Sequence, residues 1–279
     1  MTVRIVTDST ADLPPELAAD LGISVVPLHI HFAEETCEDG VTITKDEFYR
    51  RLTTEPGLPK TSAPSAGTFT DVYETLGAET DEILSIHISS KLSATHSSAL
   101  LGRDGVKADC RIAIVDSYSA SIGLGLLALR AAHLAREGAS LDAIVRDIES
   151  AIPRTQYFGV IDTLEYLHKG GRIGMATAFL GSLLHVKPIL GLRNGLAHPI
   201  ERIRGNRQKA FDRLCEMVPS YGAISSLAIA HTTAEEEMEL LATRLSQFFP
   251  PDRILKTRCG ATLGTYLGPN TLCVALIQA

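Results

Sequence analysis

The sequence contains no tryptophan, and aromatic residues make up only 5 % of its 279 positions. Its five cysteines are scattered without a close pair, at Cys37, Cys110, Cys215, Cys259 and Cys273. This spacing argues against a disulfide framework and against a structural zinc site, and isolated thiols suit a reducing compartment. We therefore expect a cytoplasmic protein without a metal centre.

Long hydrophobic runs and a surplus of basic residues are also absent. We expect neither a membrane span nor a signal peptide, because no segment is long and apolar enough and the N-terminus passes directly into a strand pattern. The net charge of −7 argues against nucleic acid as a partner, since neutralising phosphates requires a basic face. Hydrophobic residues make up 45 % of the chain, which supports a sizeable core in one large domain or two.

Hydroxyl residues cluster where apolar, strand-like runs end. The clusters are Asp8-Ser9-Thr10, Thr61-Ser62-Ala63-Pro64-Ser65, Ser89-Ser90-Lys91-Leu92-Ser93 and Asp116-Ser117-Tyr118-Ser119. In an open α/β sheet such loops meet at the carboxyl edge of the strands, where ligands bind. Hydroxyls and free backbone N–H groups at helix starts bind anions well, so this pattern predicts an oxyanion site without a catalyst.

The first half of the chain alternates strand and helix patterns. Residues 23–32 read as one strand, and residues 14–21, 45–52, 68–76, 124–136 and 141–152 read as helices. This alternation predicts parallel strands joined by helical crossovers.

The pattern changes near residue 156. Strand-like runs flank Asn194-Gly195, a strong signal for an antiparallel hairpin. Helices are expected at 207–217 and 234–248, with strands at 226–231 and near Ile254 and Leu272. Glu235, Glu236 and Glu237 suit the first turn of a helix, where the dipole favours them, better than a metal site. We predict an α/β protein with a mostly parallel sheet in residues 1–155 and a smaller α+β domain with antiparallel strands in residues 156–279, which closes over the ligand.

Six motifs resemble the DegV family in order and spacing over almost the whole chain. They are Thr7-Asp8-Ser9-Thr10-Ala11-Asp12-Leu13-Pro14, Thr61-Ser62-Ala63-Pro64-Ser65, the segment from Ser89 to Thr95, Asp116-Ser117, Leu167-His168-Lys169-Gly170-Gly171-Arg172-Ile173, and Lys187-Pro188. The resemblance implies a two-domain protein that binds a long-chain fatty acid between its domains. It also implies the non-catalytic binding subunit of a bacterial fatty acid kinase, which carries the lipid to a separate ATP-dependent subunit for acyl phosphate formation.

Carried over by position, the resemblance makes Thr61 and Ser93 the hydroxyls that bind the carboxylate, with Ser62 beside them and Arg172 as the nearby cation. Tyr266 stands where the family usually has a histidine. A tyrosine still donates a hydrogen bond, but it does not change charge near neutral pH. The fatty acid is the expected ligand, no other cofactor is expected, and the expected partners are the kinase subunit and, transiently, a membrane surface.

The tail and the head group of a fatty acid contribute to binding in different ways. About fourteen buried methylenes at roughly 0.8 kcal/mol each supply on the order of 11 kcal/mol before the costs of association. The carboxylate must instead be compensated by hydrogen bonds or a counter-charge, because burying it alone costs several kcal/mol. Candidates for the acyl-chain wall are Phe179, Leu180 and Leu183, whose helical spacing fits a domain-interface core equally well.

Each site residue also has an ordinary structural interpretation. Thr61, Ser62 and Ser93 would serve as turn or capping residues, Arg172 would pair with Glu165 or Asp162, and Asp8 and Asp116 would hold their own loops. Two other functions stay open at this stage. A module for a small polar anion would need a polar cavity, and a serine hydrolase would use Ser93 with His96 or His231 and Asp116, although no Gly-x-Ser-x-Gly elbow is present.

Overall fold

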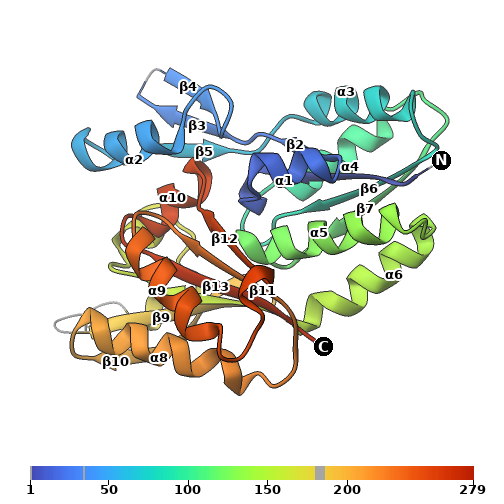
Figure 1. The fold of residues 1–279 in the computed structure, drawn as a ribbon. Helices are drawn as coiled ribbons and strands as arrows, with labels where there is room; N and C mark the ends of the chain where they lie inside the picture. The colour runs from blue at the N-terminus through green and yellow to red at the C-terminus, as the bar shows by residue number, and fades with distance from the viewer. Residues whose placement is uncertain (1, 34, 180–185) are drawn as a thin grey trace.

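The computed structural model describes residues 2–33, 35–179 and 186–279, which form three β-sheets and the helices that pack on them (Figure 1). Among these residues, no helix is both long and apolar enough to cross a membrane. The α/β fold predicted from the sequence is confirmed.

A four-stranded parallel sheet carries the hydroxyl-rich loops. Its strands, in spatial order, are β2 (Ile23–Val26), β1 (Arg4–Asp8), β6 (Glu82–His87) and β7 (Arg111–Asp116). The loops after β1, β6 and β7 therefore share the carboxyl edge, as expected. Asp8 accepts the backbone N–H of Ile88 at 3.0 Å and Asp116 accepts that of Ser90 at 3.2 Å, so both carboxylates hold the loops together.

Helices cover both faces of this sheet. They are α1 (Pro15–Asp20), α3 (Ala66–Gly77), α4 (Thr95–Asp104), α5 (Ile122–Arg136) and α6 (Leu141–Ala151). Helix α5 is buried almost all round because it lies between two sheets, packing on β1 and β6 on one side and on β11 (Ile224–His231) and β13 (Leu272–Gln278) on the other (Figure 1). A helix that is apolar on every face is stable only in such a position.

The segment 23–32, predicted as one strand, is two strands in different sheets. The first, β2, ends at Val26, and β3 (His29–Phe32) joins a three-stranded antiparallel sheet with β4 (Glu35–Glu38) and β5 (Lys60–Ser62). Pro27 causes the break, because proline cannot donate a ladder hydrogen bond inside a sheet. The consequence is an antiparallel sheet within the first half of the chain, beside α2 (Lys45–Thr54).

The second half builds a six-stranded sheet. Its strand order is β10 (Leu196–Arg204), β9 (Val186–Arg193), β8 (Thr155–Val160), β13, β11 and β12 (Ile254–Arg258), with α8 (Arg207–Ser220) and α9 (Glu235–Leu245) on one face. The predicted hairpin is confirmed: β9 and β10 pair antiparallel around Asn194 and Gly195, whose φ angles of 51° and 79° suit a type I′ turn. In the first turn of α9, Glu237 pairs with Arg207. The division into residues 1–155 and 156–279 stays a prediction, because α5 packs on both sheets.

Two buried carboxylates fix α10 (Ala261–Leu267) to the N-terminal half. Asp12 accepts the Gly260 N–H at 2.7 Å, and Asp39 accepts the N–H groups of Ala261 and Thr262 at 2.8 and 3.1 Å. These contacts satisfy N–H groups that a helix start leaves without intrahelical partners. They join segments more than 200 residues apart in the chain.

A second buried polar chain lies inside the parallel sheet. The Nδ1 atom of His87 lies 3.0 Å from Asp8 Oδ2, its Nε2 lies 2.7 Å from Ser85 Oγ, and the Tyr73 hydroxyl donates to the same Oγ at 2.8 Å. The four side chains are fully buried. Their mutual bonds satisfy polar groups that would otherwise destabilise the core.

We expect Asp39→Ala to lower the free energy of unfolding by about 2–4 kcal/mol, because it leaves two buried N–H groups of α10 without an acceptor. Asp39→Asn retains one acceptor oxygen and should lower the free energy of unfolding by less. Asp142→Ala removes a side chain that is 61 % exposed and paired with Arg111, so it serves as the control and should change little. Urea denaturation measures all three, and equal midpoints for Asp39→Ala and Asp142→Ala would contradict the anchoring role.

Candidate functional site

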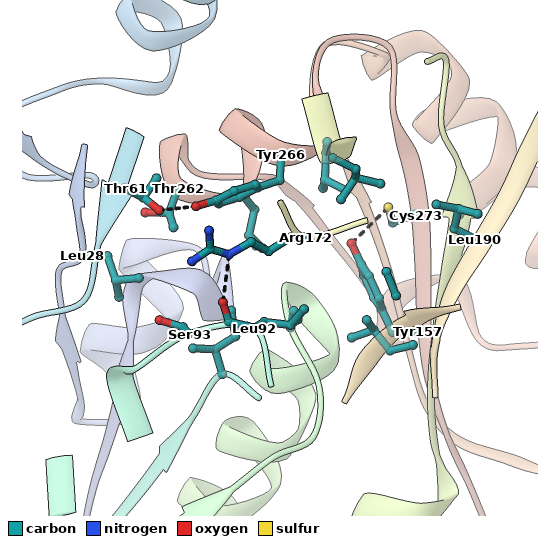
Figure 2. A pocket seen from close by; sticks show the side chains of 18 of the residues that line it. Leu28, Thr61, Leu92, Ser93, Tyr157, Arg172, Leu190, Thr262, Tyr266 and Cys273 are labelled. Atoms are coloured by element: carbon teal, nitrogen blue, oxygen red, sulfur yellow. Dashed lines mark hydrogen bonds between the residues drawn. The ribbon is translucent and has the colours of Figure 1, made fainter. Parts of the chain in front are cut away.

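A cavity of about 290 Å³, partly open to solvent, lies among all three sheets, at the carboxyl edge of the parallel one. Its wall is mostly aliphatic, and Arg172 is the one charged residue among the described residues that line it. The lining residues include Leu28, Ile88, Leu92, Ala120, Ile161, Leu167, Leu190, Leu192, Leu263 and Leu267. Figure 2 shows hydroxyls and Arg172 at one end and Tyr157, Leu190 and Cys273 at the other.

Four of the predicted binding residues meet at the polar end. The hydroxyls of Thr61 and Tyr266 lie 2.6 Å apart, and Ser93 and Arg172 line the same end of the cavity (Figure 2). Each comes from a different part of the chain: β5, α10, the loop after β6 and the loop after α7 (Glu165–Lys169). The site is therefore created by tertiary packing rather than by any local motif.

The position of Tyr266 depends on a close approach by the backbone at Gly170. A Cβ atom at Gly170 would lie 2.5 Å from Cδ1 of the tyrosine ring, so only glycine fits there. The turn brings Arg172 to the same ring, with its guanidinium carbon 5.2 Å from the ring centroid. A cation over an aromatic face is attracted by the ring quadrupole.

Arg172 is exposed at the mouth of the cavity. Its Nε donates to the Leu92 carbonyl at 3.2 Å and its Nη1 donates to the Gly170 carbonyl at 2.9 Å. The predicted alternative partners are occupied elsewhere, because Lys169 pairs with Glu165 and Lys187 pairs with Asp162. The guanidinium thus keeps its charge free of any ion pair with the described residues.

The neighbouring serines have partners of their own. Ser93 Oγ accepts the Thr95 N–H at 3.3 Å and lies 2.9 Å from the Thr95 hydroxyl, so it holds the start of α4 while lining the cavity. Ser62 also lines the cavity, but its hydroxyl has a partner of its own, lying 2.8 Å from Nε2 of His31. The cap of α3 is Ser65, which accepts the Thr68 N–H at 3.0 Å, and not Thr61 or Ser62.

No charged side chain lines the far end of the cavity in the part of the chain that the structure describes. The Tyr157 hydroxyl donates to Cys273 Sγ at 3.2 Å. Burial raises the pKa of the Cys273 thiol to about 12 and lifts the pKa of Tyr157 well above its ordinary value. Both groups therefore stay neutral at physiological pH, in an environment suited to a hydrocarbon.

The residues predicted to line an acyl chain fare differently. Phe179 is absent from the cavity wall: it ends the 3₁₀ segment η3 (Gly174–Phe179), which packs on β10, and its ring lies 4.3 Å below the guanidinium of Arg202. Leu180 and Leu183 lie outside the described residues. Phe179 thus belongs to a 3₁₀ turn rather than an α-helix, and the acyl-chain role of Leu180 and Leu183 stays a prediction.

The hydrolase set is not assembled. Asp116 accepts backbone N–H groups of Ser90 and Tyr118, and the hydroxyl of Ser93 is bonded to Thr95 rather than to a histidine. Among the described residues, His231 Nδ1 has no hydrogen-bond partner at all. A nucleophile, base and orienting acid must form a bonded chain, and these residues do not.

Sequence reasoning missed several lining residues. Thr262 sits one helical turn before Tyr266 on the same face of α10, and Tyr157 lies on β8. The spacing of four residues between Thr262 and Tyr266 was the only available signal, since such pairs share a helix face. Nothing in the sequence distinguishes Tyr157 from an ordinary strand residue.

Comparison with known proteins identifies the family. The model of the family described as "Uncharacterised protein, DegV family" matches residues 2–279. The chain belongs to the DegV family. Among its relatives are a DegV domain-containing protein of Caldanaerobacter subterraneus, 36 % identical over 96 % of both chains, and Protein DegV of Bacillus subtilis, 36 % identical over 98 % of both chains.

Two solved DegV structures superpose on the whole chain. The first is a DegV family protein from Thermus thermophilus, described for its fatty acid binding. It matches with a TM-score of 0.93 and 34 % identity, covering 100 % of both chains. DegV from Bacillus subtilis, described as a fatty acid binding protein, matches with a TM-score of 0.91 and 34 % identity, again over 100 % of both chains. Both of these solved relatives are thus described as binding fatty acids.

We expect the anchor of α10 to be sensitive to pH through Asp12. Burial raises the pKa of this carboxyl to about 6, from an ordinary value of 3.8. The folded state therefore binds the proton more tightly than the unfolded state, and wild-type stability falls as the pH rises from about 4 through 6.

Asp12→Asn removes this titration and, with φ at 52° in wild type, suits the left-handed backbone there. As the pH rises from about 4 through 6, the free energy of unfolding of wild type should fall by about 3 kcal/mol relative to that of Asp12→Asn. Parallel stability curves, measured by denaturant titration at several pH values, would show that Asp12 does not titrate in this window.

Proposed function

We propose that this protein binds one long-chain fatty acid, with the tail in the cavity and the carboxylate at its polar end. The observation that carries the proposal is the mostly aliphatic cavity that ends at Thr61, Ser93, Tyr266 and Arg172. A small polar anion would require polar groups along the wall, and the described wall is mostly aliphatic. Fatty acid binding by the solved relatives supports the same ligand.

The polar end offers what a carboxylate requires. Thr61 and Tyr266 share one hydrogen bond between their two hydroxyls, which leaves one O–H to donate outward. Ser93 and the guanidinium of Arg172 add a donor and a counter-charge. Charge-assisted hydrogen bonds are the strong kind, and here they compensate for the loss of hydration.

The head group lies next to a surface groove. Leu92, Ser93 and Arg172 line both the cavity and this groove, which also includes Ser90, Lys91 and Gly171. A carboxylate at the polar end is thus separated from solvent mainly by the contact of Arg172 with the Leu92 carbonyl. We infer that an ATP-dependent kinase subunit reaches the carboxylate here, where Lys91 and Arg172 favour a phosphoryl group, and that the protein itself is a carrier rather than an enzyme.

Lipid uptake would require brief contact with a membrane surface. Met175 in η3, close to the Arg172 turn, is 57 % exposed and apolar. This position supports uptake through the polar mouth of the cavity.

Combined replacement Thr61→Val and Ser93→Ala should weaken binding of hexadecanoic acid roughly 10- to 100-fold, because it removes two hydroxyls from the carboxylate end. Native mass spectrometry of purified protein and titration of delipidated protein measure the effect. Ser65→Ala removes a helix-cap hydroxyl outside the cavity wall and should retain ligand fully. Full retention in the double variant would refute this head-group site, and wild-type protein that takes up no fatty acid would refute the function.

Lys91→Ala should leave fatty acid affinity unchanged and slow acyl phosphate formation by the kinase subunit of the same organism, roughly fivefold at low ionic strength and less at high salt. Trapping the acyl phosphate with hydroxylamine gives the rate. Lys107→Ala, an exposed lysine outside the groove, is the matched control. Equal rates for both variants would place the kinase contact elsewhere.

A further inference from the structure

Thr262 is a buried hydroxyl residue in the cavity wall that the proposed site does not yet use. Its side chain is 3 % exposed, and its Oγ1 has no hydrogen-bond partner among the described residues. Leaving a buried hydroxyl unpaired is energetically unfavourable, so such groups are rare and invite explanation.

Thr262 lacks the usual partner of a helical threonine because it is the second residue of α10. A threonine hydroxyl in a helix normally bonds to the carbonyl three or four residues earlier. Here those carbonyls belong to Cys259 and Arg258, which precede the helix and accept the Tyr49 hydroxyl at 3.1 Å and Nζ of Lys45. The helix therefore gives Thr262 Oγ1 no intrahelical acceptor.

The position of Thr262 relates it to the head group. It lies one turn before Tyr266 on α10, both residues line the cavity, and Figure 2 draws Thr262 at the end where Thr61 and Tyr266 meet. Threonine has two accessible χ1 rotamers in a helix, and rotation between them turns its hydroxyl to a different side. A ligand at this end can therefore draw the hydroxyl toward itself.

A carboxylate has room for a further donor. Its two oxygens accept at about four lone-pair sites. One of the two O–H groups of Thr61 and Tyr266 is already used in the hydrogen bond between them. Resting on the proposed function, we propose that Thr262 donates a hydrogen bond to the bound carboxylate and so selects acids over neutral lipids of the same length. In the free protein the Thr262 hydroxyl lacks a hydrogen bond, and the bound carboxylate supplies the missing acceptor.

The test compares Thr262→Val with Thr262→Ser in the full-length, delipidated protein. Valine has the same shape without the hydroxyl, and serine keeps the hydroxyl without the methyl. We expect Thr262→Val to bind hexadecanoic acid roughly tenfold more weakly, to bind methyl hexadecanoate as wild type does, and to melt at or above the wild-type temperature without ligand. Thr262→Ser should bind the acid within a few-fold of wild type.

Thr265→Val is the matched control on the same helix. Thr265 Oγ1 donates to the Ala261 carbonyl at 3.0 Å and does not line the cavity, so its loss should lower stability and leave affinity unchanged. If wild type binds the acid and Thr262→Val binds it equally well, the role of Thr262 is overturned, but fatty acid binding is not. Absence of binding by wild type itself would instead overturn the proposed function.

Discussion

The anchoring of α10 by Asp12 and Asp39 is the constraint on which the site depends. These carboxylates accept the N–H groups at the start of the helix and tie it to the N-terminal half. Tyr266 and the other cavity-lining residues of α10 can face Thr61 only because that start is fixed. Both carboxylates are buried, so the arrangement is held by strong hydrogen bonds and is costly to break.

Helix α5 provides the second constraint by filling the space between two sheets. Its residues are buried apart from a few near its C-terminal end, such as His133 and Arg136, so the parallel sheet and the six-stranded sheet both pack on it. The cavity therefore occupies space bounded by packed elements rather than a gap between freely moving parts. In the proposed complex, the tail would leave water for contacts with aliphatic side chains, and the head group would lie near the exposed Arg172.

Much of the fold could be predicted because its signals are local. The Asn194-Gly195 turn, the apolar helix α5 and the polar loops after parallel strands each follow from a few neighbouring residues. The break at Pro27 carried a local signal too, which the continuous apolar pattern obscured. The site is different: Thr61 and Tyr266 meet across 205 positions, so only the resemblance to a family, not periodicity, could pair them. Thr262 went unnoticed because an unsatisfied hydroxyl is a property of packing, invisible in a sequence.

The buried chain Asp8–His87–Ser85–Tyr73 has a consequence for recognising enzymes from structure. Its serine, histidine and aspartate lie at the distances of a hydrolase triad, 2.7 and 3.0 Å, yet all are fully buried and none lines the cavity. A template match on side-chain geometry alone would label this protein a hydrolase. Substrate access, rather than the spacing of the three groups, separates a catalytic triad from a structural polar network that copies its shape.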